Sequence, residues 1–160
     1  MGLYFAYGSN LDIKRMMSRC PSAQVVGVGT LLDYQLVFQN NNRGTIVANL
    51  ESSALAKAIG VVYHVSELDL ETLDRVEGHP EVYKRTNVLI TLNNSIELAC
   101  VTYIMDKMYS ELVIEVDDIK SVVKERYYGS PKQEYLDHIV IGFMNFGLSY
   151  EYIFRAFDAK

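Results

Sequence analysis

Residues 23–39, AQVVGVGTLLDYQLVFQ, combine Val, Leu and aromatic side chains with glycines spaced along the run. Branched and aromatic residues favour strands, and a glycine inside such a run indicates a bend or a bulge. The stretch therefore predicts one long strand or a bent pair of strands. Beyond a polar turn at residues 40–44, the runs 45–51 and 56–65 have the same character and predict two more strands.

The segments on either side of this strand-rich part extend the pattern. A strand is predicted at residues 3–8 and a short helix at residues 11–20. After the strands, Ser66 begins a helix with the form of a capping box, because the acidic Asp69 stands three positions later. Gly78 is a typical stop for that helix.

The second half of the chain is predicted to contain one hairpin and then helices. The hairpin joins residues 82–92 and 96–105 through a turn at 93–95. Strands first and helices last indicate one α+β domain, residues 1–160, whose strands curl into a small mixed barrel or a strongly twisted sheet flanked by helices. The three helices predicted in the last third cover residues 116–129, 132–147 and 149–157.

Composition excludes several classes of protein. Apolar residues make up 49% of the 160 residues, which excludes a disordered chain. The net charge of -5 and the lack of a basic block argue against a nucleic-acid partner. No run is long enough for a membrane span, and the N-terminus lacks the pattern of a signal peptide. With only Cys20 and Cys100, which suggest reduced thiols, the chain is predicted to be a soluble cytoplasmic protein.

The first predicted strand ends in YGSN, residues 7–10. Gly, Ser and Asn favour tight turns, and such turns present backbone N–H groups that can bind an anion. The stretch therefore fits either a plain surface turn or one side of a ligand site.

Glu77 lies on the apolar face of the helix predicted after Ser66. Measured from Leu70 on a helical wheel of about 100° per residue, Leu73 falls at about 300° and Glu77 at about 340°. Burial and the negative C-terminal end of the helix both raise the pKa of a carboxyl group placed there. Such a group can accept and donate a proton near neutral pH. The alternative is a structural carboxylate paired with Arg85 or Lys84, or one exposed at a frayed helix end.

Two segments carry a family resemblance. YGSNL at residues 7–11 and LDRVEGHPEVYKR at residues 73–85 resemble the γ-glutamylcyclotransferase superfamily, including its AIG2-like and BtrG-like members. The C-terminal stretch at residues 130–153 resembles the family's P-x-x-x-Y…G…GL-x-x-x-Y segment, so the similarity spans nearly the whole chain.

The resemblance implies a mixed β-barrel flanked by helices and a reaction that needs no cofactor or metal. That reaction converts a small-molecule γ-glutamyl amine or amino acid into 5-oxoproline and the free amine or amino acid. The resemblance implies that Glu77 is the catalytic acid and base. It also implies a substrate-binding set made of Tyr7, Gly8, Ser9, Asn10, Tyr83 and Tyr135.

Other readings of the same residues stay open or fit less well. A binding protein that keeps the pocket without turnover is the main alternative function. The chain is expected to be a monomer or a homodimer. Ser9 is not in a G-x-S-x-G context, which argues against a serine hydrolase. The polar turn at 40–44 is either a plain loop or a flap whose Arg43 meets a carboxylate of the departing group. No spacing typical of metal ligands joins the histidines, which are His64, His79 and His138.

Overall fold

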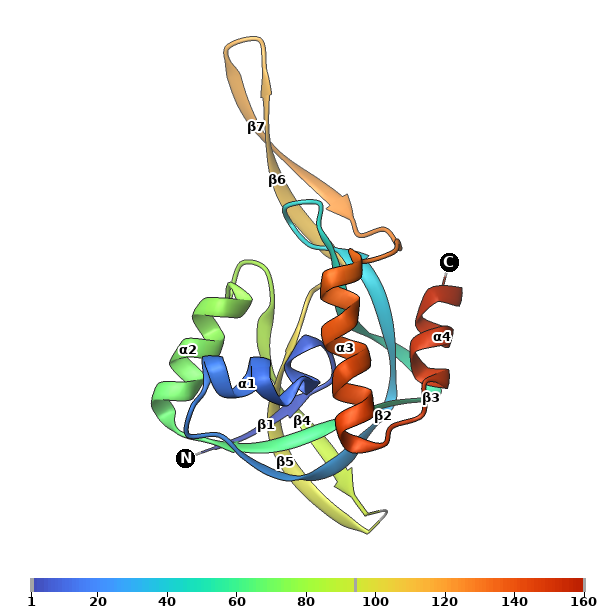
Figure 1. Ribbon diagram of the computed structural model, residues 1–160. Coiled ribbons are helices and arrows are strands. Elements are labelled where there is room, and N and C mark those ends of the chain that lie inside the picture. The colour runs from blue at the N-terminus through green and yellow to red at the C-terminus, as the bar shows by residue number, and fades with distance from the viewer. Residues whose placement is uncertain (1, 94, 160) are drawn as a thin grey trace.

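The computed structural model describes residues 2–93 and 95–159, and Figure 1 labels its helices and strands. The helical segments are η1 (Ser9–Leu11, a 3₁₀ turn), α1 (Ile13–Arg19), α2 (Glu67–Glu77), α3 (Gln133–Phe146) and α4 (Glu151–Asp158). The strands are β1 (Gly2–Ala6), β2 (Gln24–Asn40), β3 (Ile46–Val65), β4 (Lys84–Leu92), β5 (Ile96–Ile104), β6 (Met108–Glu115) and β7 (Asp118–Glu125).

Five strands close into a barrel in the order β1-β3-β2-β4-β5. Neighbouring strands run antiparallel, except that β1 runs parallel to β5 where Tyr4 pairs with Val101. Closure pairs the strand edges that would otherwise be free to bind another chain. The predicted α+β fold, a small mixed barrel flanked by helices, is therefore confirmed.

The longest strands differ from their predicted bounds. The run at 23–39 is one bent strand, β2, and the two strands predicted at 45–51 and 56–65 are a single strand, β3. The bend comes from a register shift between Leu32 and Tyr34, where Asp33 and Leu55 adopt left-handed backbone angles. An irregularity of this kind bends a strand pair without ending it, so a polar interruption in the sequence does not mark a strand end. The hairpin of β4 and β5 is confirmed, whereas its predicted turn at 93–95 includes residue 94, which lies outside the described residues.

The helix predicted at residues 116–129 is wrong. These residues contain β7, which pairs antiparallel with β6 from Met108 opposite Glu125 to Glu115 opposite Asp118. The turn between the two strands places Val116 and Asp117 in the left-handed region. β-Branched residues occupy three of the eight positions of β7, and cross-strand pairing decides the conformation of the strand more than local helical spacing does.

The helix α2 forms as predicted. The Ser66 hydroxyl accepts a hydrogen bond from the N–H of Asp69 at 3.1 Å, and the Asp69 carboxylate accepts one from the N–H of Ser66 at 3.1 Å. Gly78 ends the helix in the left-handed conformation. Leu70 and Leu73 are buried, so the apolar face of α2 is held against the body of the protein.

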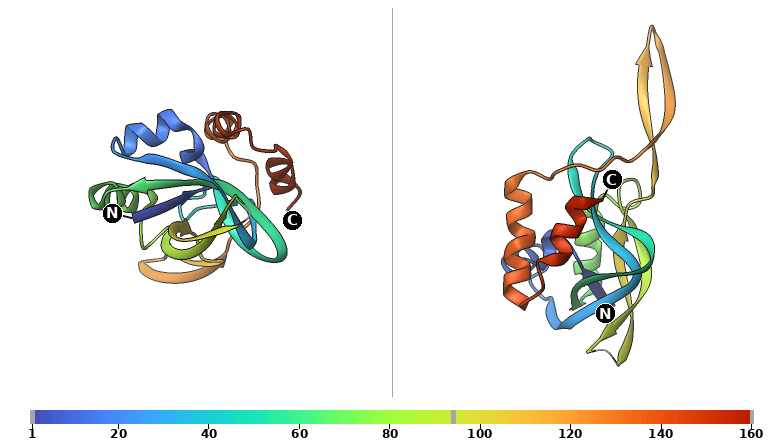
Figure 2. Two further views of the ribbon diagram at one scale, coloured as in Figure 1. Left: turned by 90° about the horizontal axis from the view of Figure 1, so that it is seen from below. Right: turned by 90° about the vertical axis from the view of Figure 1, so that its right-hand side faces the viewer.

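The helices α1, α3 and α4 lie on the outside of the curled strands (Figure 2). Helix α3 crosses very close to η1, because a Cβ added to Gly142 would lie 2.2 Å from the Cβ of Leu11. Only glycine allows so close an approach. The ring of Phe157 in α4 packs at 4.9 Å from the ring of Phe38 in β2. The outer helices are thereby fixed to the same core as the barrel.

The composition led to predictions about the cysteines and about membrane spans, and both features can be examined in the described residues. Cys20 and Cys100 are buried free thiols, and burial raises the pKa of each to about 11. In residues 2–93 and 95–159, no helix has the length and apolar character needed to cross a membrane.

Candidate active site

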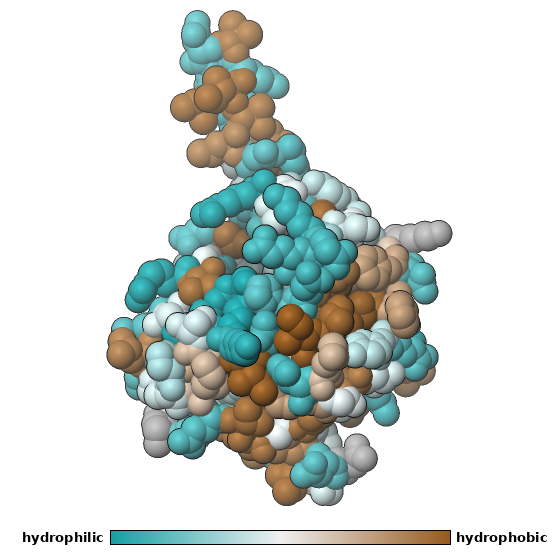
Figure 3. Space-filling model, in the orientation of Figure 1, coloured by the Kyte–Doolittle hydropathy of each residue, from teal (hydrophilic) through white to brown (hydrophobic). Residues whose placement is uncertain are grey.

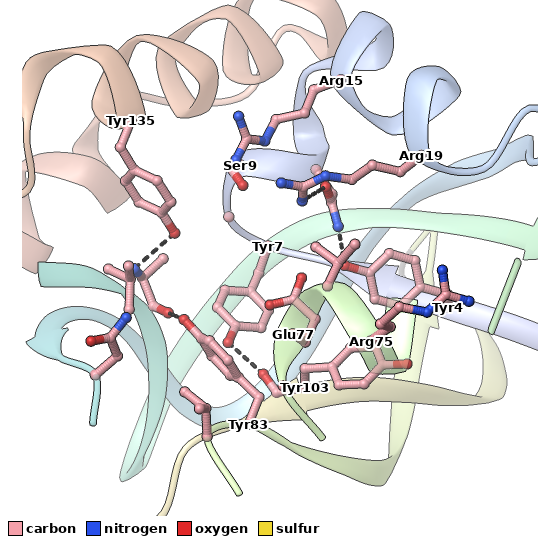
Figure 4. A pocket seen from close by; sticks show the side chains of 18 of the residues that line it. Tyr4, Tyr7, Ser9, Arg15, Arg19, Arg75, Glu77, Tyr83, Tyr103 and Tyr135 are labelled. Carbon is pink, nitrogen blue, oxygen red and sulfur yellow. Dashed lines mark hydrogen bonds between the residues drawn. The ribbon is translucent and has the colours of Figure 1, made fainter. Parts of the chain in front are cut away.

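A cavity of about 350 Å³ lies where β1, η1, α1 and the end of α2 meet (Figure 4). This volume is at the small end of the range for small-molecule sites. Its lining residues are Tyr4, Tyr7, Gly8, Ser9, Asn10, Arg15, Arg19, Asn41, Arg43, Val47, Ala48, Arg75, Val76, Glu77, Gly78, Val82, Tyr83, Tyr103 and Tyr135.

Every residue named from the sequence as a site candidate lines this one cavity. The stretch Tyr7 to Asn10 follows β1, and Glu77 is the last residue of α2. Tyr83 directly precedes β4, and Tyr135 stands in the first turn of α3. The barrel fold thus brings together segments that are more than one hundred residues apart in the chain.

The side chain of Glu77 has no hydrogen bond or ion pair with another described residue, and only its backbone carbonyl accepts a bond, from the N–H of Tyr83 at 3.3 Å. The alternative of a pair with Arg85 or Lys84 is wrong, because Arg85 makes a bidentate pair with Asp74 and Lys84 pairs with Asp106. In Figure 4 the Glu77 carboxylate points into the cavity.

The electrostatic environment of Glu77 combines two opposed effects. Burial raises the pKa of its carboxyl group, and the positive charges of Arg19 and Arg15 lower it. Burial is the larger effect, so the pKa lies above that of an ordinary glutamate. A carboxylate with a raised pKa and no fixed partner is suited to receive a proton and pass it on.

The loop after β1 offers backbone donors at the cavity. The N–H of Leu11 bonds to the carbonyl of Gly8 at 3.1 Å, whereas the N–H groups of Gly8, Ser9 and Asn10 donate to no acceptor within the described part of the chain. A Cβ on Gly8 would lie 3.2 Å from that of Ala48, so the loop runs close to the opposite wall. Free N–H groups in such a loop form a concave site for an anion.

The side chain of Asn10 is fully engaged. Its Nδ2 donates to the hydroxyl of Tyr4 at 3.0 Å, and its Oδ1 accepts from Nη1 of Arg19 at 2.7 Å. Both polar atoms of the Asn10 side chain therefore have partners within the protein, and Asn10 holds Arg19 in place.

Tyrosines form the opposite wall. The hydroxyl of Tyr83 donates to the carbonyl of Ala48 at 2.5 Å, and the hydroxyl of Tyr135 accepts from the N–H of Ala48 at 3.0 Å. The hydroxyl of Tyr7 donates to the carbonyl of Tyr103 at 2.5 Å. Burial raises the pKa of Tyr7 and Tyr83 well above its usual value and that of Tyr135 to about 12, so these hydroxyls stay neutral.

The sequence-based set missed most of the positive charge. Arg15 and Arg19 stand one turn apart on α1, and Arg43 and Arg75 also line the cavity. Glu77 is the one acid among the described lining residues. The four-residue spacing of Arg15 and Arg19 directly after YGSN is the signal that was available, because it places both on one face of the following helix.

Other candidate chemistries lack their partners. Ser9 lines the cavity, but no histidine does so among the described residues. Nδ1 of His79 accepts a hydrogen bond from the N–H of Arg85 at 3.0 Å, outside the cavity. Within residues 2–93 and 95–159, no three His, Cys, Asp or Glu side chains are grouped so that they could hold a metal ion.

Comparison with known proteins finds a matching family and several curated relatives. The family described as "Gamma-glutamyl cyclotransferase, AIG2-like" matches residues 4–129. Human gamma-glutamylcyclotransferase is 34% identical over 110 residues, and the mouse protein is 32% identical over 111 residues. Both matches cover 64% of this chain and 58% of the relative, so less than two thirds of each curated relative is matched.

Solved structures share the fold over almost the whole chain. A structure of a gamma-glutamyl cyclotransferase superposes with a TM-score of 0.77 at 27% identity, covering 99% of this chain and 88% of the other. An uncharacterized human protein superposes with a TM-score of 0.76 at 28% identity and the same coverage.

Proposed function

Because this chain belongs to the AIG2-like family of gamma-glutamyl cyclotransferases, we propose that it converts a γ-glutamyl amine or γ-glutamyl amino acid into 5-oxoproline and the free amine or amino acid. The observation that carries the proposal is Glu77, a carboxylate with a raised pKa and no fixed partner, facing a cavity rich in arginine. The small cavity volume also suits a substrate of this size.

The proposed reaction is an intramolecular acyl transfer. The α-amine of the substrate attacks its own γ-carbonyl carbon, which forms the ring C–N bond and breaks the bond to the departing nitrogen. Glu77 takes a proton from the attacking amine and delivers a proton to the departing nitrogen, so it is regenerated with each turnover. No water is consumed and no cofactor takes part. The folded pose of the substrate supplies the proximity of amine and carbonyl.

The remaining cavity residues are proposed to bind and orient the substrate. The N–H groups of Gly8, Ser9 and Asn10 are suited to an α-carboxylate or to the oxyanion that develops on the γ-carbonyl. Arg15 and Arg19 add positive charge beside them. Tyr7, Tyr83 and Tyr135 form the wall against which the carbon chain packs. Arg43, on the turn after β2, is proposed to face a carboxylate of the departing group.

A binding protein without turnover is the weaker candidate. Such a protein would gain from a Glu77 locked in an ion pair, since an unpaired buried carboxylate lowers stability. Arg85 and Lys84, the partners considered from the sequence, are paired with Asp74 and Asp106 instead. An unpaired carboxylate is therefore better explained by proton transfer.

The proposed function is tested by incubating the pure protein with a panel of γ-glutamyl amines and amino acids and measuring 5-oxoproline. Release of 5-oxoproline is expected from at least one compound. The same compound with an acetylated α-amine should release none, because its nucleophile is blocked. Turnover of the acetylated compound, or no turnover across the panel, would contradict the proposal.

Arg19→Met is expected to raise KM roughly 10- to 100-fold with a smaller change in kcat, because it removes one charge-assisted contact to a substrate carboxylate. Lys14→Met is the matched control, since Lys14 is an exposed cation on the same helix and does not line the cavity. Its KM should equal that of the wild type. An unchanged KM in Arg19→Met would remove Arg19 from the binding set.

A further inference from the structure

The hydroxyl of Tyr4, on β1, lines the cavity, and its proton has no acceptor in the described part of the chain. The side chain is buried, and its oxygen accepts a hydrogen bond from Nδ2 of Asn10 at 3.0 Å. Within residues 2–93 and 95–159, no group accepts a hydrogen bond from the O–H itself. A hydroxyl can accept and donate at the same time, so Tyr4 retains one unused donor for a ligand in the cavity.

Three other tyrosines of the cavity differ from Tyr4 because the fold uses their protons. The hydroxyls of Tyr7 and Tyr83 donate to the carbonyls of Tyr103 and Ala48. The hydroxyl of Tyr103 donates to a carboxylate on α2 at 2.6 Å. These three donors are therefore committed before a ligand enters.

Tyr135 also has an unused proton, but its place in the cavity is different. Its hydroxyl accepts from the N–H of Ala48, on the wall opposite α1. In Figure 4 the hydroxyl of Tyr4 points toward the Glu77 carboxylate, and no hydrogen bond joins the two groups. A substrate whose reacting carbonyl lies beside Glu77 is therefore within reach of Tyr4.

A chain of hydrogen bonds strengthens Tyr4 as a donor. Nη1 of Arg19 donates to Oδ1 of Asn10 at 2.7 Å, and the amide of Asn10 donates to Tyr4. Each bond in such a chain polarises the next. Arg19 belongs to α1, over which hydrophilic residues gather on the surface (Figure 3), whereas Tyr4 is buried in the strand. The chain thus carries the influence of a cation to a donor in a site with little water.

The Tyr4 hydroxyl keeps its proton at neutral pH. Burial and the negative charge of Glu77 raise its pKa well above the usual value for tyrosine. A fixed neutral donor stabilises negative charge that develops during a reaction, and it does so more strongly in a buried site than in water. Tyr4 is therefore suited to stabilise charge, whereas Glu77 is suited to move a proton.

We propose that Tyr4 is a second catalytic residue, whose hydroxyl donates a hydrogen bond to the oxyanion formed on the γ-carbonyl of the substrate; this inference rests on the proposed function. Attack by the α-amine forms the C–N bond and moves the π electron pair of the carbonyl onto its oxygen. The pair returns when the bond to the departing nitrogen breaks. Tyr4 holds its proton throughout, and Glu77 carries the proton between the two nitrogens. The free amides of residues 8–10 are then left for the α-carboxylate.

Tyr4→Phe removes only the donor, so kcat for 5-oxoproline release is expected to fall about 10²-fold with little change in KM. Tyr63→Phe is the matched control. Tyr63 is fully buried, its ring stacks on that of Tyr4 at 6.5 Å, and its hydroxyl donates to the carbonyl of Asn10 at 3.3 Å. It does not line the cavity, so its kcat should stay close to that of the wild type.

Two further measurements separate this role from a structural one. A γ-glutamyl compound with hydrogen in place of its α-amine cannot cyclise, and Tyr4→Phe should bind it with the Kd of the wild type. The acidic limb of kcat/KM should also stay at the wild-type pH, because the proposed bond goes to the substrate and not to Glu77. Weaker binding of that compound, or a shifted limb, would overturn the proposal.

The outcomes for Tyr4 and for the proposed function can be told apart. Equal kcat in the wild type and Tyr4→Phe, or an equal loss in Tyr63→Phe, would overturn the role of Tyr4 and leave the proposed function in place. A wild type without turnover across the γ-glutamyl panel would contradict the proposed function itself, and the role of Tyr4 with it.

Discussion

The Glu77→Gln variant is expected to lose about 10³-fold in kcat while KM changes little, because the amide cannot take up or deliver a proton. The side chain keeps its size, so the cavity and the binding of the substrate should persist. The measurement is 5-oxoproline release from the best compound of the γ-glutamyl panel. Glu71→Gln is the matched control, because Glu71 is exposed on the same helix. Equal turnover of wild type and Glu77→Gln would show that Glu77 is not the proton carrier.

The raised pKa of Glu77 gives the same variant a second readout. Because burial raises the pKa in the folded state, the folded protein holds this proton more tightly than the unfolded chain. The wild type therefore loses stability relative to Glu77→Gln as pH rises from the ordinary pKa of a glutamate through the raised value. In denaturant unfolding, Glu77→Gln should be the more stable protein at neutral pH and equal to the wild type in acid. A variant that is less stable at neutral pH would mean that the ionised carboxylate has a stabilising partner.

Activity should follow the same titration. The ionised form of Glu77 accepts the first proton, so kcat/KM of the wild type is expected to fall as pH drops through the raised pKa. The acidic limb should lie above the pH at which an ordinary glutamate titrates. An acidic limb at the pH where an ordinary glutamate titrates would indicate that burial does not control the pKa of Glu77.

Gly142→Ala is expected to lower the free energy of unfolding by about 3 kcal/mol. The new Cβ would lie 2.2 Å from the Cβ of Leu11, 2.5 Å from its carbonyl carbon and 2.8 Å from the nitrogen of Asp12. These are mostly backbone positions, so α3 must move away from η1. The direction of this change in the free energy of unfolding is informative, because replacing glycine by alanine in a helix otherwise stabilises a protein by about 0.5–1 kcal/mol.

Urea unfolding measures the effect of Gly142→Ala, and Met144→Ala serves as its control. Met144 is 64% exposed on the same helix, so its replacement should change stability by no more than about 0.5 kcal/mol. Displacement of α3 also moves Tyr135 away from Ala48, which should raise KM for the γ-glutamyl substrate. A Gly142→Ala variant as stable as the wild type would show that the contact between α3 and η1 relaxes easily.

Local signals in the sequence predicted the elements that local chemistry controls. The α2 helix carries its start and stop in Ser66 and Gly78, and both residues act as predicted. The continuity of β3 was not predictable from the same kind of signal, because a bulge opposite Asp33 carries the strand through a polar interruption. Residues 116–129 were assigned to a helix for a related reason. Their strand conformation depends on pairing with β6, which local spacing does not record.

The residues of the candidate site were likewise only partly predictable from the sequence. Glu77 was visible because a carboxylate on an apolar helix face conflicts with the pattern around it. Of the cavity arginines only Arg43 was considered from the sequence; Arg15, Arg19 and Arg75 were missed, because an arginine on a helix resembles any solvated cation. Arg15 and Arg75 lie far apart in the chain, and only the closed barrel brings them to one cavity. Their combined charge is a property of the fold and not of either segment.

The two hydrogen bonds at Ala48 make the two sides of the cavity chemically different. Tyr83 occupies the carbonyl of Ala48 and Tyr135 its N–H, so that peptide edge has no polar group left to offer a ligand. On the other side, Arg15 and Arg19 lie beside the free amides of the loop after β1. A molecule with a charged head and a carbon chain therefore has one favourable way to enter, with its head toward α1 and its chain along the tyrosines. The cavity therefore favours one orientation of such a molecule at the stage of binding.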